Sequence, residues 1–269
     1  CRYSVFLLRW KPSFFCADYP HLRKLRLEDV TLAALEPLFN ARMPCLRAFE
    51  FSCRAHAYAA DFERSLFEGL SKLLAALPLE TLALSFCDNM NAASTVVDLP
   101  TARRLVFHAG AIPRINAPNL NFLQLCWRAE TASRTEEITR LLHNCPSLHE
   151  LHLESDFLRQ GYLPERAICE ALRSGAGRQL RQIALKNLLV PPSVFHCLAE
   201  IKTLNHLSIK LSCPTPQDVL SLSRMSNLRV LDLHLCVEAV PDTHRHEAAA
   251  GERKQSAALA ELKLAKLTL

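Results

Sequence analysis

The chain has 269 residues, 49% of them hydrophobic, and this length and composition exclude an intrinsically disordered protein. Only 6 residues are glycine, so the glycine-rich loops that bind phosphate in many nucleotide-dependent enzymes have little support. The formal net charge of +5 is small and no block of like charges concentrates it, so we expect no nucleic-acid partner.

The 11 cysteines are spread along the chain instead of clustering as in a disulfide-stapled module. The sequence shows no secretory leader and no run of 18 apolar residues. We therefore expect an intracellular protein, cytoplasmic or nuclear, that does not span a membrane. Because the chain begins with Cys1 and stops at Leu269 directly after an apolar segment, we also expect it to be a monomeric module within a longer chain.

A hexapeptide with apolar residues at positions 1, 4 and 6 recurs along the whole chain. Its first copy is Leu22-Arg-Lys-Leu25-Arg-Leu27, and the mean interval between copies is about 26 residues. The ten copies begin at Leu22, Leu46, Leu79, Ala102, Leu120, Leu148, Leu180, Leu204, Leu228 and Leu259. Each copy predicts a short strand, because apolar residues at every second position suit a sheet with one buried face.

The segments between the hexapeptides predict helices wherever their length allows. Apolar residues at helical spacing occur over 31–39, 61–77, 136–143, 164–173, 192–199 and 217–223. The interval from Ala102 to Leu120 is short and contains Pro113 and Pro118, so no full helix is expected there.

The ten hexapeptides resemble those of leucine-rich-repeat proteins. This resemblance implies an α/β solenoid of about ten degenerate repeats, with a parallel sheet on its concave face and helices and irregular turns on its convex face. The family's small polar residue after the strand is matched here by Cys87 and Cys236. We expect residues 20–269 to form the solenoid and residues 1–19 an N-terminal cap or the tail of a preceding segment. Residues 242–258 are predicted to be a charged insertion, and the C-terminal cap is expected to be missing.

Residues at positions 3 and 5, and the residue after position 6, are predicted to point away from the core onto the concave face. Aromatic side chains rimmed by polar groups are typical of protein-binding hot spots, and such a group is predicted near the middle of the chain. A small basic patch is predicted beyond it. The candidate partner-binding residues are Arg104, Phe122, Gln124, Cys126, Trp127, Glu150, His152, Glu154, Lys186, His206, Lys210, Asp232 and His234. For Trp127, burial under the edge of the sheet is an equal alternative.

A catalytic site has weaker support. His108, Cys126 and Glu154 are predicted to share one column, which formally supplies a base, a nucleophile and a carboxylate. A flat sheet face offers neither oxyanion donors nor a pocket that excludes water, so we expect no enzyme and no small-molecule substrate. No pair of Cys or His motifs has the spacing of a metal site, so no metal and no cofactor are expected.

The segment from Leu141 to Leu153, with Cys145 before its hexapeptide, resembles the cysteine-containing repeats of F-box leucine-rich-repeat proteins. Those proteins select substrates for ubiquitin ligases, so the resemblance implies a protein-interaction module that binds a macromolecular partner on its concave face. Residues 1–19 contain no F-box, which would have to precede Cys1. The alternative is a sensor or regulatory repeat domain of a larger signalling protein, of the nucleotide-binding receptor or GTPase-regulator type.

The inside-outside assignment predicts opposite effects for neighbouring residues. Leu151→Asp should unfold its own and adjacent repeats, because it places an unpaired charge in a continuous core. His152→Ala should leave the fold intact, because its side chain points outward. Thermal melts followed by circular dichroism test this, and the reverse order of stability would mean that the assignment is wrong by one residue.

Overall fold

The computed structural model describes residues 4–7, 18–28, 38, 41–52, 60–86, 96–108, 114–127, 134–155, 161–162, 165–173, 175–186, 188–190, 192–212, 221–236 and 266–268. The chain divides into two compact units. Unit 1 comprises residues 1–128 and 136–147, and unit 2 comprises residues 129–135 and 148–269. Each unit contains its own series of parallel strands.

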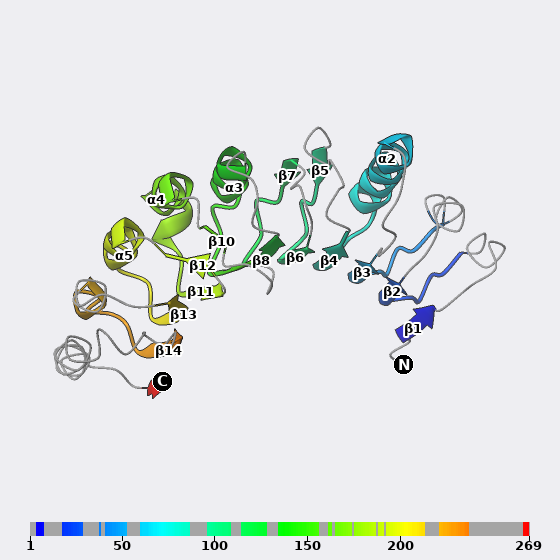
Figure 1. The fold of residues 1–269 in the computed structure, drawn as a ribbon. Helices are drawn as coiled ribbons and strands as arrows, with labels where there is room; N and C mark the ends of the chain where they lie inside the picture. The colour runs from blue at the N-terminus through cyan, green and yellow to red at the C-terminus, as the bar shows by residue number, and fades with distance from the viewer. Residues whose placement is uncertain are drawn as a thin grey trace. The chain divides into compact units, whose positions relative to one another are not determined.

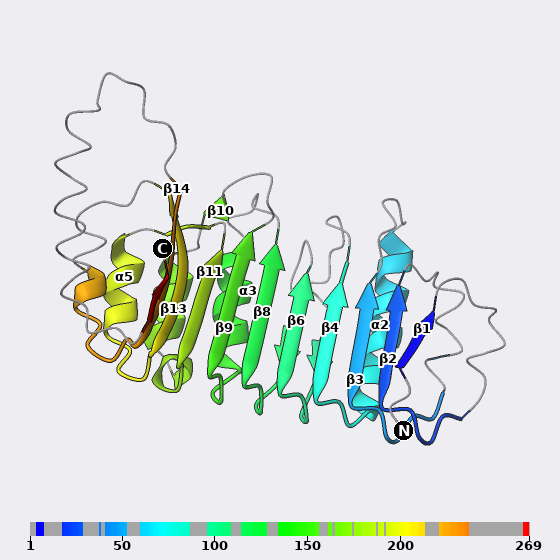
Figure 2. The same cartoon turned by 90° about the horizontal axis from the view of Figure 1, so that it is seen from below.

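In unit 1, the strands of the main sheet pair in parallel in chain order (Figure 2). Two other short strands form a separate sheet. The strands of the main sheet are β1 (Ser4–Leu7), β2 (Lys24–Glu28), β3 (Ala48–Ser52), β4 (Thr81–Ser85), β6 (Arg104–His108) and β8 (Phe122–Trp127). The register places equal positions of the hexapeptide side by side: Leu25 pairs with Phe49, and Phe49 with Leu82. The repeats predicted from the sequence are therefore in register in the sheet.

Unit 2 follows the same rule. Its parallel strands are β9 (Glu150–Ser155), β11 (Gln182–Lys186), β13 (His206–Ser212), β14 (Val230–Cys236) and β15 (Lys266–Thr268). Leu151 pairs with Ile183, Ile183 with Leu207 and Leu207 with Leu231. The expected α/β repeat, with one parallel strand for each hexapeptide from Leu22 to Leu228, is thus present in both units.

The apolar positions of the hexapeptide form the core of each unit. Leu151 is 1% exposed and Leu231 is 0% exposed, whereas the outward neighbours His152 and Asp232 are half-buried. Position 1 is buried as well, from Leu22 through Leu228. This confirms the predicted alternation along the strands, except at Phe122 and Ala184, which occupy outward positions but are only 7% and 3% exposed.

Helices cover one side of the strands in each unit (Figure 1). They are α2 (Ala60–Ala76) and α3 (Arg134–His143) in unit 1, and α4 (Glu165–Arg173) and α5 (Pro192–Ala199) in unit 2. These agree with the helices predicted over 61–77, 136–143, 164–173 and 192–199, and residues 221–223 are also helical. Apart from Leu38, the helix predicted over 31–39 lies outside the described residues.

Two short parallel pairs replace helices in some of the connections. β5 (Val96–Asp98) pairs with β7 (Arg114–Asn116), and β10 (Gly161–Tyr162) pairs with β12 (Leu188–Leu189). Strand β7 lies in the interval from Ala102 to Leu120, where no full helix was expected. The described part of that interval contains this strand and no helix.

A tight turn brings the chain into several of the strands. In the turn before β3, the carbonyl oxygen of Met43 accepts a hydrogen bond of 3.1 Å from the amide of Leu46, and the turn from Ala117 to Leu120 is alike. Pro44 and Pro118 occupy the second position of these turns, where the fixed backbone angle of proline is favourable. Proline thus shapes the turns of a chain that has little glycine.

Hydrogen bonds between repeats converge on the carbonyl at position 2 of the hexapeptide. The carbonyl oxygen of Arg181 accepts bonds from the amides of Asn205 (2.9 Å) and His206 (3.0 Å). The carbonyls of residues 23, 47, 80, 103, 149 and 205 each accept the two equivalent amides of the following repeat. One position therefore joins each repeat to the next within its unit.

Side chains in the turns add a second set of bonds between repeats. The hydroxyl of Thr203 donates to the carbonyl of Leu180 at 2.7 Å, and Thr101 donates to Leu79 at 2.8 Å. The amides of Asn119 and Asn227 donate to backbone carbonyls in the turn of the preceding repeat, at 2.7 Å in both cases. These contacts satisfy carbonyls that the sheet leaves without a partner.

Two findings alter the predicted ends of the repeat series. The last hexapeptide was placed at Leu259, which would align Leu262 with Leu231, and this register is wrong: Leu267 pairs with Leu231. The chain from Leu264 to Leu269 matches the same pattern, and periodicity alone could not separate the two. Within residues 1–19, β1 aligns Val5 with Leu25 in parallel, as a further repeat strand would. The predicted charged insertion, 242–258, lies outside the described residues.

The substitution Thr203→Val tests the bonds between repeats. It keeps the size of the side chain but removes the donor to the Leu180 carbonyl, so we expect the free energy of unfolding to fall by about 1 kcal/mol. Urea denaturation measures this. Thr81→Val is the matched control, since the Thr81 hydroxyl makes no hydrogen bond to another described residue, and an equal loss in both variants would contradict the assigned role.

Candidate functional site

The sheet face opposite the helices carries the residues proposed to bind a partner. In unit 1, Arg104 is exposed and Gln124 and Cys126 are half-buried. In unit 2, Lys186 is exposed, and the residues half-buried there are Glu150, His152, Glu154, His206 and Asp232. Trp127, Lys210 and His234 lie in strands β8, β13 and β14, but their side chains are outside the described part of the structure.

Charged side chains pair across the first strands of unit 1. Lys24 on β2 forms an ion pair with Glu50 on β3 at 2.5 Å, and the guanidinium of Arg26 lies 3.7 Å from the other oxygen of Glu50. Arg26 also pairs with Glu28 on its own strand. Such exposed pairs add little to stability, but they fix the directions of the side chains and balance the charge at this end of the face.

A hollow of about 270 Å³ adjoins these pairs on the face of unit 1. It forms because small residues follow one another on neighbouring strands: Ser52 on β3 and Ala83 and Ser85 on β4. Val106 and His108 on β6 close its far side, and Arg26 and Glu50 its near side. The hollow can therefore accept a protruding apolar or polar side chain of another protein.

Phe122 differs from its predicted role as an exposed aromatic anchor. Its side chain is only 7% exposed, because the guanidinium of Arg104 on the preceding strand lies 3.5 Å from the centre of its ring. This cation–π contact covers the ring and leaves Arg104 as the exposed group. The sequence placed both residues on this face but could not show that one covers the other.

Histidines on the face of unit 2 are held by side chains of the next strand. Nε2 of His206 on β13 lies 3.1 Å from a carboxylate oxygen of Asp232 on β14. Nε2 of His152 on β9 lies 3.3 Å from the amide nitrogen of Gln182 on β11. These contacts orient hydrogen-bonding groups on a surface of mixed charge, which suits recognition of a polar protein surface.

The residues considered for nucleophilic catalysis are divided between the two units. His108 and Cys126 are neighbours in the register of β6 and β8, but Glu154 belongs to the other unit. Burial raises the pKa of the Cys145 thiol to about 12, so this thiol is protonated at neutral pH and is not a nucleophile. Among the described residues, no group of His, Cys, Asp or Glu side chains is arranged to hold a metal ion.

A column of arginines was missed in the sequence. Residues at position 2 line the edge of each unit where its strands begin, next to the listed concave positions. This edge column contains Arg23, Arg47, Arg103, Arg181 and Arg229. The dipeptide Leu-Arg or Ala-Arg at the start of five hexapeptides indicates this column. The sequence analysis did not use it, because it assigned only positions 3 and 5 and the residue after position 6 to a surface.

Comparisons with known proteins leave the family open. No family model matches the chain, and no curated protein matches its sequence. Among solved structures, an internalin from Listeria monocytogenes is similar at 12% identity, over 91% of this chain and 86% of the internalin chain, with a TM-score of 0.24. This similarity is too low to carry a conclusion about fold or function. No helix in the described ranges is long and apolar enough to cross a bilayer.

A double-mutant cycle tests the cover that Arg104 forms over Phe122. We expect Arg104→Ala and Phe122→Leu to be coupled by about 0.5–1 kcal/mol in the free energy of unfolding, because either change removes the cation–π contact. Urea denaturation of the single and double variants measures the coupling. The same cycle with Arg103→Ala in place of Arg104→Ala is the control, and equal coupling in both cycles would contradict the contact.

Proposed function

We propose that the chain is a leucine-rich-repeat module that binds a protein partner on the sheet face opposite its helices. The main support is that the strands of β2 to β14 whose burial is described present outward residues at fixed positions on this face, with Phe122 and Ala184 as buried exceptions, while the apolar positions are used in the core. A repeated face of this kind provides many independently variable contact residues on a rigid support.

The chemistry of the face supports a protein partner over a small molecule. Exposed and half-buried groups of both signs occur along it, including Arg104, Glu154 and Lys186. The hollow at Ala83 is open and shallow, so it suits one side chain of a larger ligand more than an enclosed substrate. We infer that the protein is not an enzyme and acts by recognition.

The sharper form of this proposal is a substrate receptor of an F-box ubiquitin ligase. Its support is the resemblance of the repeat around Cys145, whose turn residue is fully buried in the core. A sensor or regulatory domain of a larger signalling protein is the second candidate. Both use the same face, and the proteins that accompany the chain in the cell distinguish them.

Arginine substitutions on the face provide the test. Ala83→Arg fills the hollow of unit 1 and Ser208→Arg adds bulk at the centre of the face of unit 2, so each is expected to abolish capture of a partner that contacts its unit. Ala75→Arg is the matched control, because Ala75 is exposed on α2 at the helix side. The measurement is quantitative affinity purification from native cells, with circular dichroism to verify folding.

Which variants lose a captured partner decides whether the proposal holds. A partner that is kept by Ala75→Arg and lost by a face variant supports it, and recovery of a ligase adaptor together with that partner supports the substrate-receptor form. If both face variants capture the same proteins as the unsubstituted chain, the proposed binding face is wrong.

A further inference from the structure

The edge of unit 2 where the strands begin forms a second surface, which adjoins the sheet face. Position 2 of four successive repeats contributes to it, and the strand register places these residues in line. A hollow of about 410 Å³ lies along this edge and is lined by His149, Arg181, Gln182, Asn205, His206 and Arg229. We call this hollow, with those residues, the edge hollow.

The backbone at the edge hollow is already satisfied. The carbonyls of His149, Arg181 and Asn205 each accept two amides from the following repeat. The backbone is therefore fixed and has little capacity to bind a ligand. Recognition at this edge depends on the side chains that project from it.

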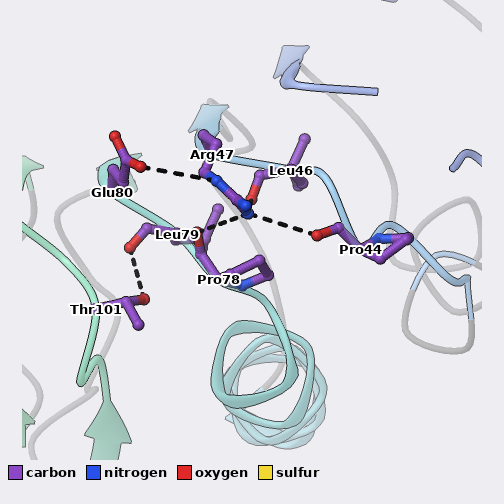
Figure 3. A network of polar contacts seen from close by, with 7 residues as sticks. All are labelled: Pro44, Leu46, Arg47, Pro78, Leu79, Glu80 and Thr101. Atoms are coloured by element: carbon purple, nitrogen blue, oxygen red, sulfur yellow. Dashed lines mark hydrogen bonds and ion pairs between the residues drawn. The ribbon is translucent and has the colours of Figure 1, made fainter. Parts of the chain in front are cut away.

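At the equivalent edge of unit 1, one arginine has side-chain partners. The guanidinium of Arg47 lies 3.7 Å from the carboxylate of Glu80 and donates hydrogen bonds to the carbonyls of Pro44 (3.4 Å) and Pro78 (3.3 Å) (Figure 3). Arg103 follows Glu80 in the same column, on the strand after the carboxylate that pairs with Arg47. The charge of Arg47 is thus balanced within the protein.

Within the described ranges, Arg181 and Arg229 have no such partners. Both are exposed, and neither forms an ion pair or a side-chain hydrogen bond with another residue in the part of the chain that the structure describes. They stand on either side of Asn205, two strands apart, so their Cα atoms are separated by about 10 Å. Because neither guanidinium has a partner among the described residues, each can bind an anion.

We propose that the edge hollow binds an acidic peptide segment of a partner protein, with two of its carboxylates paired to Arg181 and Arg229. Alternate side chains of an extended peptide lie about 7 Å apart on one side, within reach of two long arginine side chains. The planar guanidinium binds a carboxylate through two parallel hydrogen bonds. The Asn205 amide lies between them and can bond the peptide backbone.

The lining favours a peptide over nucleic acid. The carboxylate of Glu150 lies in the same hollow and repels a chain that carries a phosphate at every unit, whereas a peptide can place an uncharged residue opposite it. Val230 adds an apolar wall that a peptide side chain can contact. The site shares Glu150 and His206 with the proposed binding face, but Arg181 and Arg229, which would pair with the peptide, lie outside that face.

Fluorescence anisotropy with a labelled peptide of alternating Glu and Ser tests this proposal. We expect binding that weakens as NaCl is raised, and that weakens about tenfold in Arg181→Gln/Arg229→Gln. Arg103→Gln is the matched control from the same column of unit 1 and should bind as tightly as the unsubstituted chain. Because all three arginines are exposed, we expect the thermal melts of these variants to coincide.

Several outcomes would overturn the proposal. A peptide of alternating Gln and Ser that binds equally well would exclude carboxylate recognition, and an equal loss in Arg103→Gln would exclude a localised site. If a labelled single-stranded oligonucleotide binds more tightly and is lost in the double variant, the ligand is nucleic acid. Ser208→Arg is expected to still bind the acidic peptide. This variant therefore distinguishes a failure of the sheet-face proposal from a failure of this one.

Discussion

The leucines of each repeat are buried only because another repeat lies beside them. A single hexapeptide with its connection could not shield Leu151 or Leu231 from water, so the stability of each unit comes from contacts between neighbours. The strand register follows from this requirement, because equal positions must stand side by side for the apolar residues to form a continuous core. The positions of the side chains on the outward face follow from that alignment.

The alignment gives the two outward surfaces different characters. On the sheet face, neighbouring strands bring Lys24 to Glu50 and His206 to Asp232, so many polar groups are matched within the protein. At the edge where strands begin, the side chains have fewer neighbours, and their charge is balanced only where an acidic residue such as Glu80 occurs in the same column. Local composition therefore decides which arginines are available to another molecule.

The sequence alone predicted the strands and most of the helices, because both follow from the spacing of apolar residues. It failed for the last strand, where Leu262 and Leu267 fit the same pattern and the choice depends on pairing with β14. It also assigned Phe122 to the correct face but did not predict that its side chain is buried. That burial depends on the rotamer of Arg104, which periodicity does not encode. Side-chain contacts between repeats are the part that required a structure.

The shared carbonyl at position 2 has a consequence for how such a chain can change in evolution. Arg23, Glu80 and Asn205 have very different side chains, yet each offers the same backbone oxygen to the same two amides of the next repeat. A junction of this kind places no demand on residue identity. Whole repeats could therefore be duplicated, lost or exchanged within the gene while the backbone connection is preserved, and selection would act mainly on whether the apolar side chains still fill the core.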